Sequence, residues 1–166
     1  MKKIKLLIAG FVLLTVQSIS AQDFSKLSEI QLTDTLSCAQ AQPKVIECCN
    51  FLLANPCTEN IQSLSAMKFL LDWMSATPKY NFTFEHNLFK SIKADTNLTA
   101  RYYAALAKCA IENNYIVNSM DLQLKAITLF IGYCEKPDNG VKITVTLQKY
   151  IDAIHANNLK DLIIVR

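Results

Sequence analysis

The sequence predicts an all-α protein with five to six mostly antiparallel helices, packed as a bundle or as a stack of helical hairpins. Apolar residues recur at helical spacing in successive segments, and the connections between these segments are short and marked by Pro or Asn. Glycine is scarce, with three in the 166-residue chain and only Gly132 and Gly140 beyond residue 21. Hairpin turns and phosphate-binding loops depend on glycine, so a β-sandwich or a nucleotide-binding α/β fold is not expected.

The first 21 residues have the three-part pattern of a secretory signal peptide. Three lysines lie within the first five residues, and the run over 4–16 is almost wholly apolar, interrupted by Lys5 and Thr15. Mostly small and polar residues follow up to Ala21. This run of about 13 residues is shorter than the roughly 20 that a membrane-spanning helix needs. Cleavage after Ala21, with cleavage after Ser20 as the alternative, leaves one helical domain over 22–166. We therefore expect a periplasmic or secreted protein.

The expected mature chain has no net charge. The formal charge of +3 comes from 17 basic and 14 acidic side chains, and removal of the three signal lysines leaves 14 of each. The remaining charges are scattered singly, without the basic stripe that binding of nucleic acid requires. No later apolar segment is long enough to cross a bilayer. Neither a nucleic-acid partner nor a membrane span after signal removal is expected.

The first long helix is predicted over residues 43–54. Apolar residues repeat there at helical spacing, and Pro43 stands in the first turn, where its missing N–H is harmless. The helix is predicted to end before Pro56, because the residue before a proline rarely stays helical. Asp34 or Ser37 is the expected cap ahead of this region.

The second helix is predicted to begin after a Thr58 cap and to end before Pro78. Its expected inner face is a stripe formed by Ile61, Leu64, Met67, Leu70, Leu71 and Met74. A third helix, containing 88–92, is expected after a Thr83 cap.

The fourth helix is predicted to be capped by Asn97 and to end at Asn113 and Asn114. Its stripe is Leu98, Tyr102, Ala105, Leu106 and Cys109. Ser119 is the expected cap of a fifth helix, with Leu122, Ala126, Leu129, Phe130 and Tyr133 facing inward. Residues 137–140 read as a turn. The last long helix is predicted to start near Thr144 and to end at Asn157 and Asn158, before a short helix or packed tail over 159–165.

Six cysteines remain after the signal, and an even number in an oxidising compartment permits disulfides. They are Cys38, Cys48, Cys49, Cys57, Cys109 and Cys134, which leave 15 complete pairings open. In an antiparallel hairpin Cys109 and Cys134 are roughly 16 Å apart, beyond the roughly 7 Å that a disulfide tolerates between Cα atoms. A Cys49–Cys57 bridge across the predicted bend is closer, but mostly buried free thiols are the main expectation. No spacing typical of a metal site is present, and no metal is predicted.

Only two histidines are present, His86 and His155. No metal-binding or nucleophile motif surrounds either, so both, together with Glu85, are expected to be polar surface residues. The alternative is a small hydrolase in which His86 or His155 acts as general base. That hypothesis requires the histidine to lie in a concave pocket, hydrogen-bonded to Asp, Glu or Cys. No catalytic or cofactor-binding residue is predicted, and no cofactor is expected.

The most distinctive stretch is aromatic and spans residues 73–84. It contains the candidate partner-binding residues Trp73, Tyr80, Phe82 and Phe84. Aromatic side chains dominate the binding energy of many interfaces, which is the functional interpretation of this stretch. The favoured interpretation is a loop folded over the core, filling a gap between helices.

Three stretches carry a resemblance to a known group. They are the Ser-Ala-Gln at the end of the signal, the segment FLLANP over 51–56, and Trp73-Met74 followed by TPKYNF over 77–82. On these motifs the chain resembles a group of exported all-helical proteins of the Bacteroidota. The group has no assigned activity, so the resemblance implies localisation and fold only.

These features favour an exported, non-enzymatic helical scaffold or binding protein of the cell envelope, with another envelope protein or a peptide as partner. One alternative is an inhibitor or immunity factor of an envelope enzyme, and another is the small hydrolase described above. A small-molecule carrier is a further possibility, and it requires a closed apolar cavity between the helices.

Overall fold

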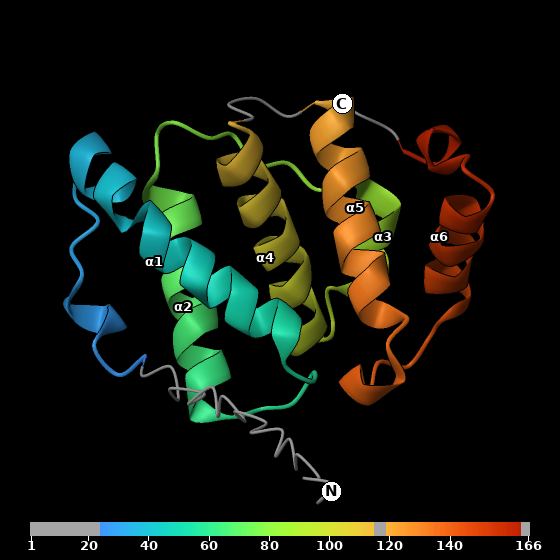
Figure 1. Ribbon diagram of the computed structural model, residues 1–166, viewed down its shortest axis with the longest axis horizontal. Helices are drawn as coiled ribbons and strands as arrows, with labels where there is room; N and C mark the ends of the chain where they lie inside the picture. The colour runs from blue at the N-terminus through green and yellow to red at the C-terminus, as the bar shows by residue number, and fades with distance from the viewer. Residues whose placement is uncertain (1–23, 115–118, 164–166) are drawn as a thin grey trace, which may run out of the picture.

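The computed structural model describes residues 24–114 and 119–163, and the predicted signal peptide over 1–21 lies outside them. The described residues form six α-helices and three short 3-10 turns, without strands, which confirms the predicted all-α class (Figure 1). The helices are α1 Thr35–Ala54, α2 Ile61–Ala76, α3 His86–Ile92, α4 Thr96–Asn113, α5 Met120–Cys134 and α6 Val145–His155. The turns are η1 Leu27–Glu29, η2 Pro137–Asn139 and η3 Leu159–Asp161.

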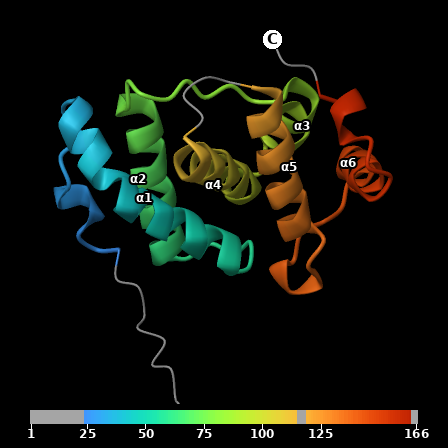
Figure 2. The same ribbon diagram turned by 45° about the horizontal axis from the view of Figure 1, so that its top comes forward.

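Helix α4 lies at the centre of the fold. It packs against α1 and α2 on one side and against α3 and α5 on the other, while α6 lies at the far edge on α3 and α5 (Figures 1 and 2). Its buried residues include the alanines Ala100, Ala104, Ala105, Ala107 and Ala110. Small side chains allow neighbouring helices to approach closely, so one helix can contact four others.

Helix α1 begins well before the predicted start at residue 43. Asp34 caps it, since Asp34 Oδ1 accepts a hydrogen bond from the Ser37 N–H at 2.7 Å and Ser37 Oγ accepts one from the Asp34 N–H at 3.0 Å. Pro43 therefore lies inside the helix, not in its first turn. Burial of Cys38 and Ala41 in the core supports the extra turns that proline alone would disfavour.

Helix α2 buries a different face from the predicted stripe. Asn60 caps it in place of Thr58, and Ile61 and Leu64 are 73% and 43% exposed. The buried face consists of Ser63, Ala66, Phe69, Leu70 and Trp73. The apolar residues of α2 lie on several of its faces, so their spacing did not define which face is buried. The buried face contains small residues where α1 and α4 pack closely against it.

The remaining helix boundaries agree closely with the sequence. Ser119 and Thr144 cap α5 and α6 as predicted, and Asn114 ends α4 in the left-handed conformation at φ 53°. Two caps were wrong by two residues, because Glu85 caps α3 instead of Thr83 and Asp95 caps α4 instead of Asn97. In the predicted tail, η3 covers 159–161, and 164–165 lie outside the described residues.

Within the two described ranges, no helix is both long enough and apolar enough to cross a membrane.

Candidate functional site

The side chain of Glu85 lies in the interior, where the sequence predicted a surface residue. It is 1% exposed, and its Oε2 accepts the Leu88 N–H at 2.7 Å, which caps α3. Its other oxygen, Oε1, is buried without a hydrogen-bond partner among the described residues. The prediction was wrong because it rested on the first turn of a short helix, whereas burial here is imposed by α4 and α6.

Two tyrosines from distant helices enclose Glu85. Tyr150 on α6 donates its hydroxyl to Glu85 Oε2 at 2.5 Å, and Tyr102 on α4 accepts the Glu85 N–H at 3.1 Å. Burial raises the pKa of both phenols, and for Tyr150 the hydrogen bond to Glu85 raises the pKa further. Both hydroxyls therefore remain protonated at neutral pH and serve as hydrogen-bond donors.

Gln123 on α5 extends this network. Tyr102 Oη donates to Gln123 Oε1 at 3.4 Å, and Gln123 Nε2 donates to the carbonyl of Thr83 at 3.0 Å. The bonds connect α4, α5 and α6 to the start of α3. A buried network of this kind fixes the relative positions of its members, because each unmade bond would leave a desolvated polar group.

A groove of about 590 Å³ runs between α3 and α6 above this network. It is lined by Asn87, Lys90, Ser91, Thr146, Lys149, Tyr150 and Leu162. The two charged lining residues are lysines. Asn87, Ser91 and Thr146 offer amide and hydroxyl groups, and Leu162 and the ring of Tyr150 form an apolar floor. The volume falls in the range of roughly 300–1,000 Å³ typical of ligand sites. Such a surface is suited to carboxylate or phosphate groups.

The charge changes sign farther along α6. A shallower depression of about 340 Å³ shares Lys149 and Leu162 with the groove and adds Asp152 and Asp161. Lys149 therefore stands at the boundary between a basic and an acidic surface. An anionic ligand is expected to prefer the side of Lys90.

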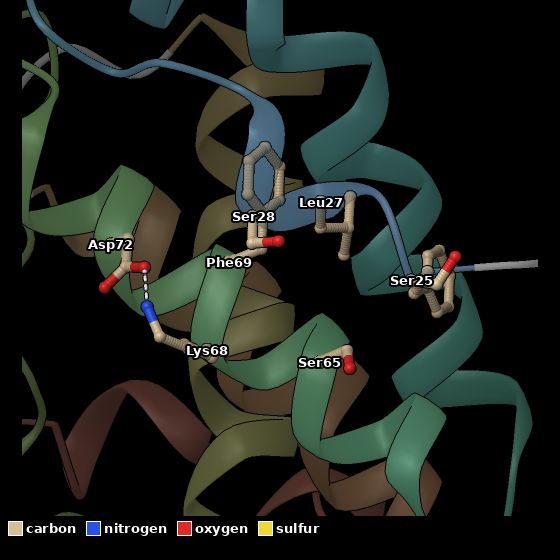
Figure 3. A pocket seen from close by; sticks show the side chains of 8 residues that line it. Ser25, Leu27, Ser28, Ser65, Lys68, Phe69 and Asp72 are labelled. Atoms are coloured by element: carbon tan, nitrogen blue, oxygen red, sulfur yellow. Dashed lines mark hydrogen bonds and ion pairs between the residues drawn. The ribbon is translucent and has the colours of Figure 1, made fainter.

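A smaller pocket lies under the N-terminal segment, between η1 and α2 (Figure 3). It measures about 90 Å³, and Phe24, Leu27 and Phe69 give it an apolar wall. Lys68 and Asp72 form an ion pair at its rim, 2.5 Å apart (Figure 3). Its volume is well below that of typical ligand sites, so it reads as a packing gap where η1 meets α2.

The two histidines are both exposed, as predicted. His155 Nε2 lies 2.9 Å from Glu135 Oε1, but the histidine side chain is 63% exposed. Neither histidine lines the α3–α6 groove or the N-terminal pocket. These two pockets thus give the hydrolase hypothesis no histidine, and that hypothesis stays a prediction.

The aromatic stretch packs on the core. Trp73 is fully buried and donates its indole N–H to the carbonyl of Cys38 at 2.8 Å, while Tyr80 is 6% exposed. Phe82 and Phe84 are partly exposed. Trp73 therefore offers no surface to a partner and Tyr80 very little, and a binding role for the stretch, most accessible at Phe82 and Phe84, stays a prediction.

All six cysteines lie in the described residues, and all are free thiols. Five are buried and Cys57 is partly exposed. Among the described residues, no group of three or more His, Cys, Asp or Glu side chains is arranged to hold a metal ion.

Glu85, Lys90 and Lys149 were not predicted to belong to one site. Tyr150 stands on the apolar stripe of α6, so its inward position could be inferred, but its partner is 65 residues away. No local signal connects α3 to α6, since the groove exists only because α3 packs on α4, α6 packs on α5, and α3 and α6 contact each other.

Comparison of the chain with protein-family models, with curated protein sequences and with solved structures finds no match.

Proposed function

We propose that this chain is an exported, non-enzymatic binding protein of the cell envelope that holds a carboxylate-bearing segment of a partner protein in the α3–α6 groove. The observation that carries this proposal is the pairing of Lys90 and Lys149 across a concave surface with no acidic residue in its lining. Two ammonium groups facing one groove attract an acidic segment and repel a basic one.

The buried hydrogen bond between Tyr150 and Glu85 holds the floor of the groove in place. Tyr150 is 3% exposed and its hydroxyl is bonded to Glu85, so the floor of the groove is fixed before any ligand arrives. A preformed surface loses less conformational entropy on binding than a mobile one. Asn87, Ser91 and Thr146 add neutral hydrogen-bonding groups suited to a peptide backbone.

Binding is favoured over hydrolysis because the titratable groups near the groove are poor candidates for acid–base chemistry. The phenol of Tyr150 has a raised pKa, and both histidines lie outside the lining. The inhibitor or immunity-factor alternative remains compatible with a binding groove, since it differs only in what the partner is.

The test measures binding of a fluorescent poly-glutamate peptide by anisotropy at low ionic strength. We expect the double variant Lys90→Glu/Lys149→Glu to lose about tenfold or more in affinity, since two attractive charge pairs become repulsive. The matched control is Lys26→Glu/Lys79→Glu, which changes the same number of exposed lysines elsewhere and should change affinity far less.

A second measurement uses the same proteins as bait in extracts of the native envelope. The proposal predicts a captured protein that is lost with the groove variant, retained with the control variant and displaced by poly-glutamate. Equal losses in both variants would place the binding surface elsewhere, and absence of peptide binding to the wild type would contradict an acidic partner.

A further inference from the structure

The loop that carries Cys57 is fixed against the end of α5. The Cys57 N–H donates to the Asn139 carbonyl at 3.0 Å, and Tyr133 Oη donates to the Asn55 carbonyl at 2.9 Å. Asn139 Nδ2 in turn donates to the Tyr133 carbonyl at 2.8 Å. The bond from Tyr133 to Asn55 joins residues 78 positions apart in the chain, so the loop after α1 and the last turn of α5 form one contact.

Arg101 completes this contact from the central helix. Its side chain is completely buried, and its two terminal nitrogens donate to the carbonyls of Pro56 at 2.9 Å and Asn97 at 3.2 Å. Its Nε has no partner, and no carboxylate among the described residues forms an ion pair with it. A buried cation whose partners are carbonyls and the Tyr133 hydroxyl, without a carboxylate among the described residues, makes its surroundings electropositive.

The thiol of Cys57 lies within the influence of this cation. Partial burial raises the pKa of Cys57 above its ordinary value, and the Arg101 charge and a hydrogen bond with Tyr133 offset only part of that rise, to which Asp95 also contributes. Cys57 is also the one thiol of the six that is not fully buried. Its partial exposure, and not its pKa, therefore gives a soluble disulfide access to this thiol.

Cys134 lies at the end of α5, directly after Tyr133, whose hydroxyl is bonded to the loop that carries Cys57. Cys134 is 3% exposed, and burial raises its pKa to about 12, with the neighbouring Cys57 contributing in the same direction. Cys48, Cys49 and Cys109 are buried in the helices α1 and α4, away from solvent.

We propose that Cys57 and Cys134 are a dithiol pair that closes to a disulfide by exchange with a disulfide supplied from outside. The Cys57 thiolate attacks one sulfur of the external disulfide, and the other sulfur leaves as a thiolate that takes up a proton. The Cys134 thiolate then attacks the Cys57 sulfur of the mixed disulfide, and the second external thiol leaves. Two protein thiols are oxidised, and one external disulfide is reduced to two thiols.

The position of Cys57 allows this closure. Residues 55–60 form the irregular connection between α1 and α2, so rotation of the Cys57 side chain toward α5 leaves the helices and the bond from the Cys57 N–H to Asn139 in place. A bond between Cys57 and Cys134 would join α1–α2 to α5–α6 across α4. This inference is independent of the proposed binding function, because neither cysteine lines the α3–α6 groove.

The test treats the purified full chain with oxidised glutathione and maps its peptides without reduction by mass spectrometry. We expect one cross-linked pair containing Cys57 and Cys134, lighter by two hydrogens than the sum of its peptides. Thermal unfolding of the oxidised protein should shift upward by roughly 5–15 °C, because the bond closes a long loop in the unfolded chain.

Variants separate the two steps. In Cys134→Ser, glutathione should remain attached to Cys57, since no second thiol resolves the mixed disulfide. In Cys57→Ser the cross-link should disappear, whereas the control Cys109→Ala should form it as the wild type does. A cross-link between other cysteines, glutathione on a different cysteine of the Cys134→Ser variant, or six free thiols after treatment would each overturn the proposal.

Discussion

Tyr150 on α6 donates its hydroxyl to the buried carboxylate of Glu85 at the start of α3, 2.5 Å away. This bond connects the last long helix of the chain to a segment 65 residues earlier. It also fixes the tyrosine that lines the α3–α6 groove. The stability of the C-terminal part and the shape of the groove therefore depend on the same pair.

Replacing Tyr150 by Phe should destabilise the protein by about 1.5–3 kcal/mol, because the Glu85 carboxylate would lose a donor and stay desolvated. Chemical denaturation measures this change directly. The matched control is Tyr103→Phe, whose hydroxyl has no hydrogen bond to another described residue and whose loss should change stability by less than about 0.5 kcal/mol. Glu85→Gln in the Tyr150→Phe background should cost less than in the wild type if the pair is coupled.

Replacing Trp73 by Phe should lower the free energy of unfolding by about 2–4 kcal/mol. The smaller ring leaves a cavity in a fully buried site, and the bond to the Cys38 carbonyl is lost. Trp73 is the single tryptophan of the chain, so unfolding of the wild type is expected to shift its emission to longer wavelength. Circular dichroism is used for the variant. An unchanged midpoint would contradict the buried position assigned to the indole.

Replacing Arg101 by Lys should destabilise the protein by about 1–3 kcal/mol. The planar guanidinium reaches the carbonyls of Pro56 and Asn97 together, and a single ammonium group cannot reproduce that fork. The control Lys142→Arg changes an exposed side chain and should be neutral. Equal stability of the Arg101 variant and the wild type would show that the fork adds nothing beyond a charge.

Asp34 should make the start of α1 sensitive to acid. The Ser37 N–H, which donates to the carboxylate, holds the pKa of Asp34 below its ordinary value of 3.8. A lowered folded pKa means that this stabilisation is present above the unfolded value near 3.8 and is lost as the pH falls through the folded value. Asp34→Asn keeps the cap without a titrating group. Between pH 4 and pH 2 the wild type should therefore lose more stability than this variant, as measured by denaturation at each pH.

The helices were largely predictable where local chemistry defines them. Ser119 and Thr144 cap their helices through their own side chains, and the pair Asn113–Asn114 ends α4 through one left-handed residue. The orientation of α2 was not predictable, because apolar residues cover much of its surface and its neighbours decide which of them are buried. The first turns of α1 were missed because Pro43 is a strong start signal, whereas the core supports a helix that continues through it.

The candidate site was less predictable than the fold. Glu85 stands beside an exposed histidine in the sequence, and only the tyrosines of α4 and α6 place it in the interior. Lys90 and Lys149 are ordinary surface residues by local criteria. Their common groove results from the packing of α3 on α6, which no sequence period describes.

The alanine-rich sides of α4 set a limit on how this protein can vary. Ala104, Ala105 and Ala107 have no exposed surface, and neighbouring helices surround them. An added methyl group at one of these positions would have to push a whole helix outward, at a cost of about 1–3 kcal/mol. The least tolerant positions of the chain are thus expected among its smallest side chains, while the large residues Ile61 and Leu36 at the surface can change freely.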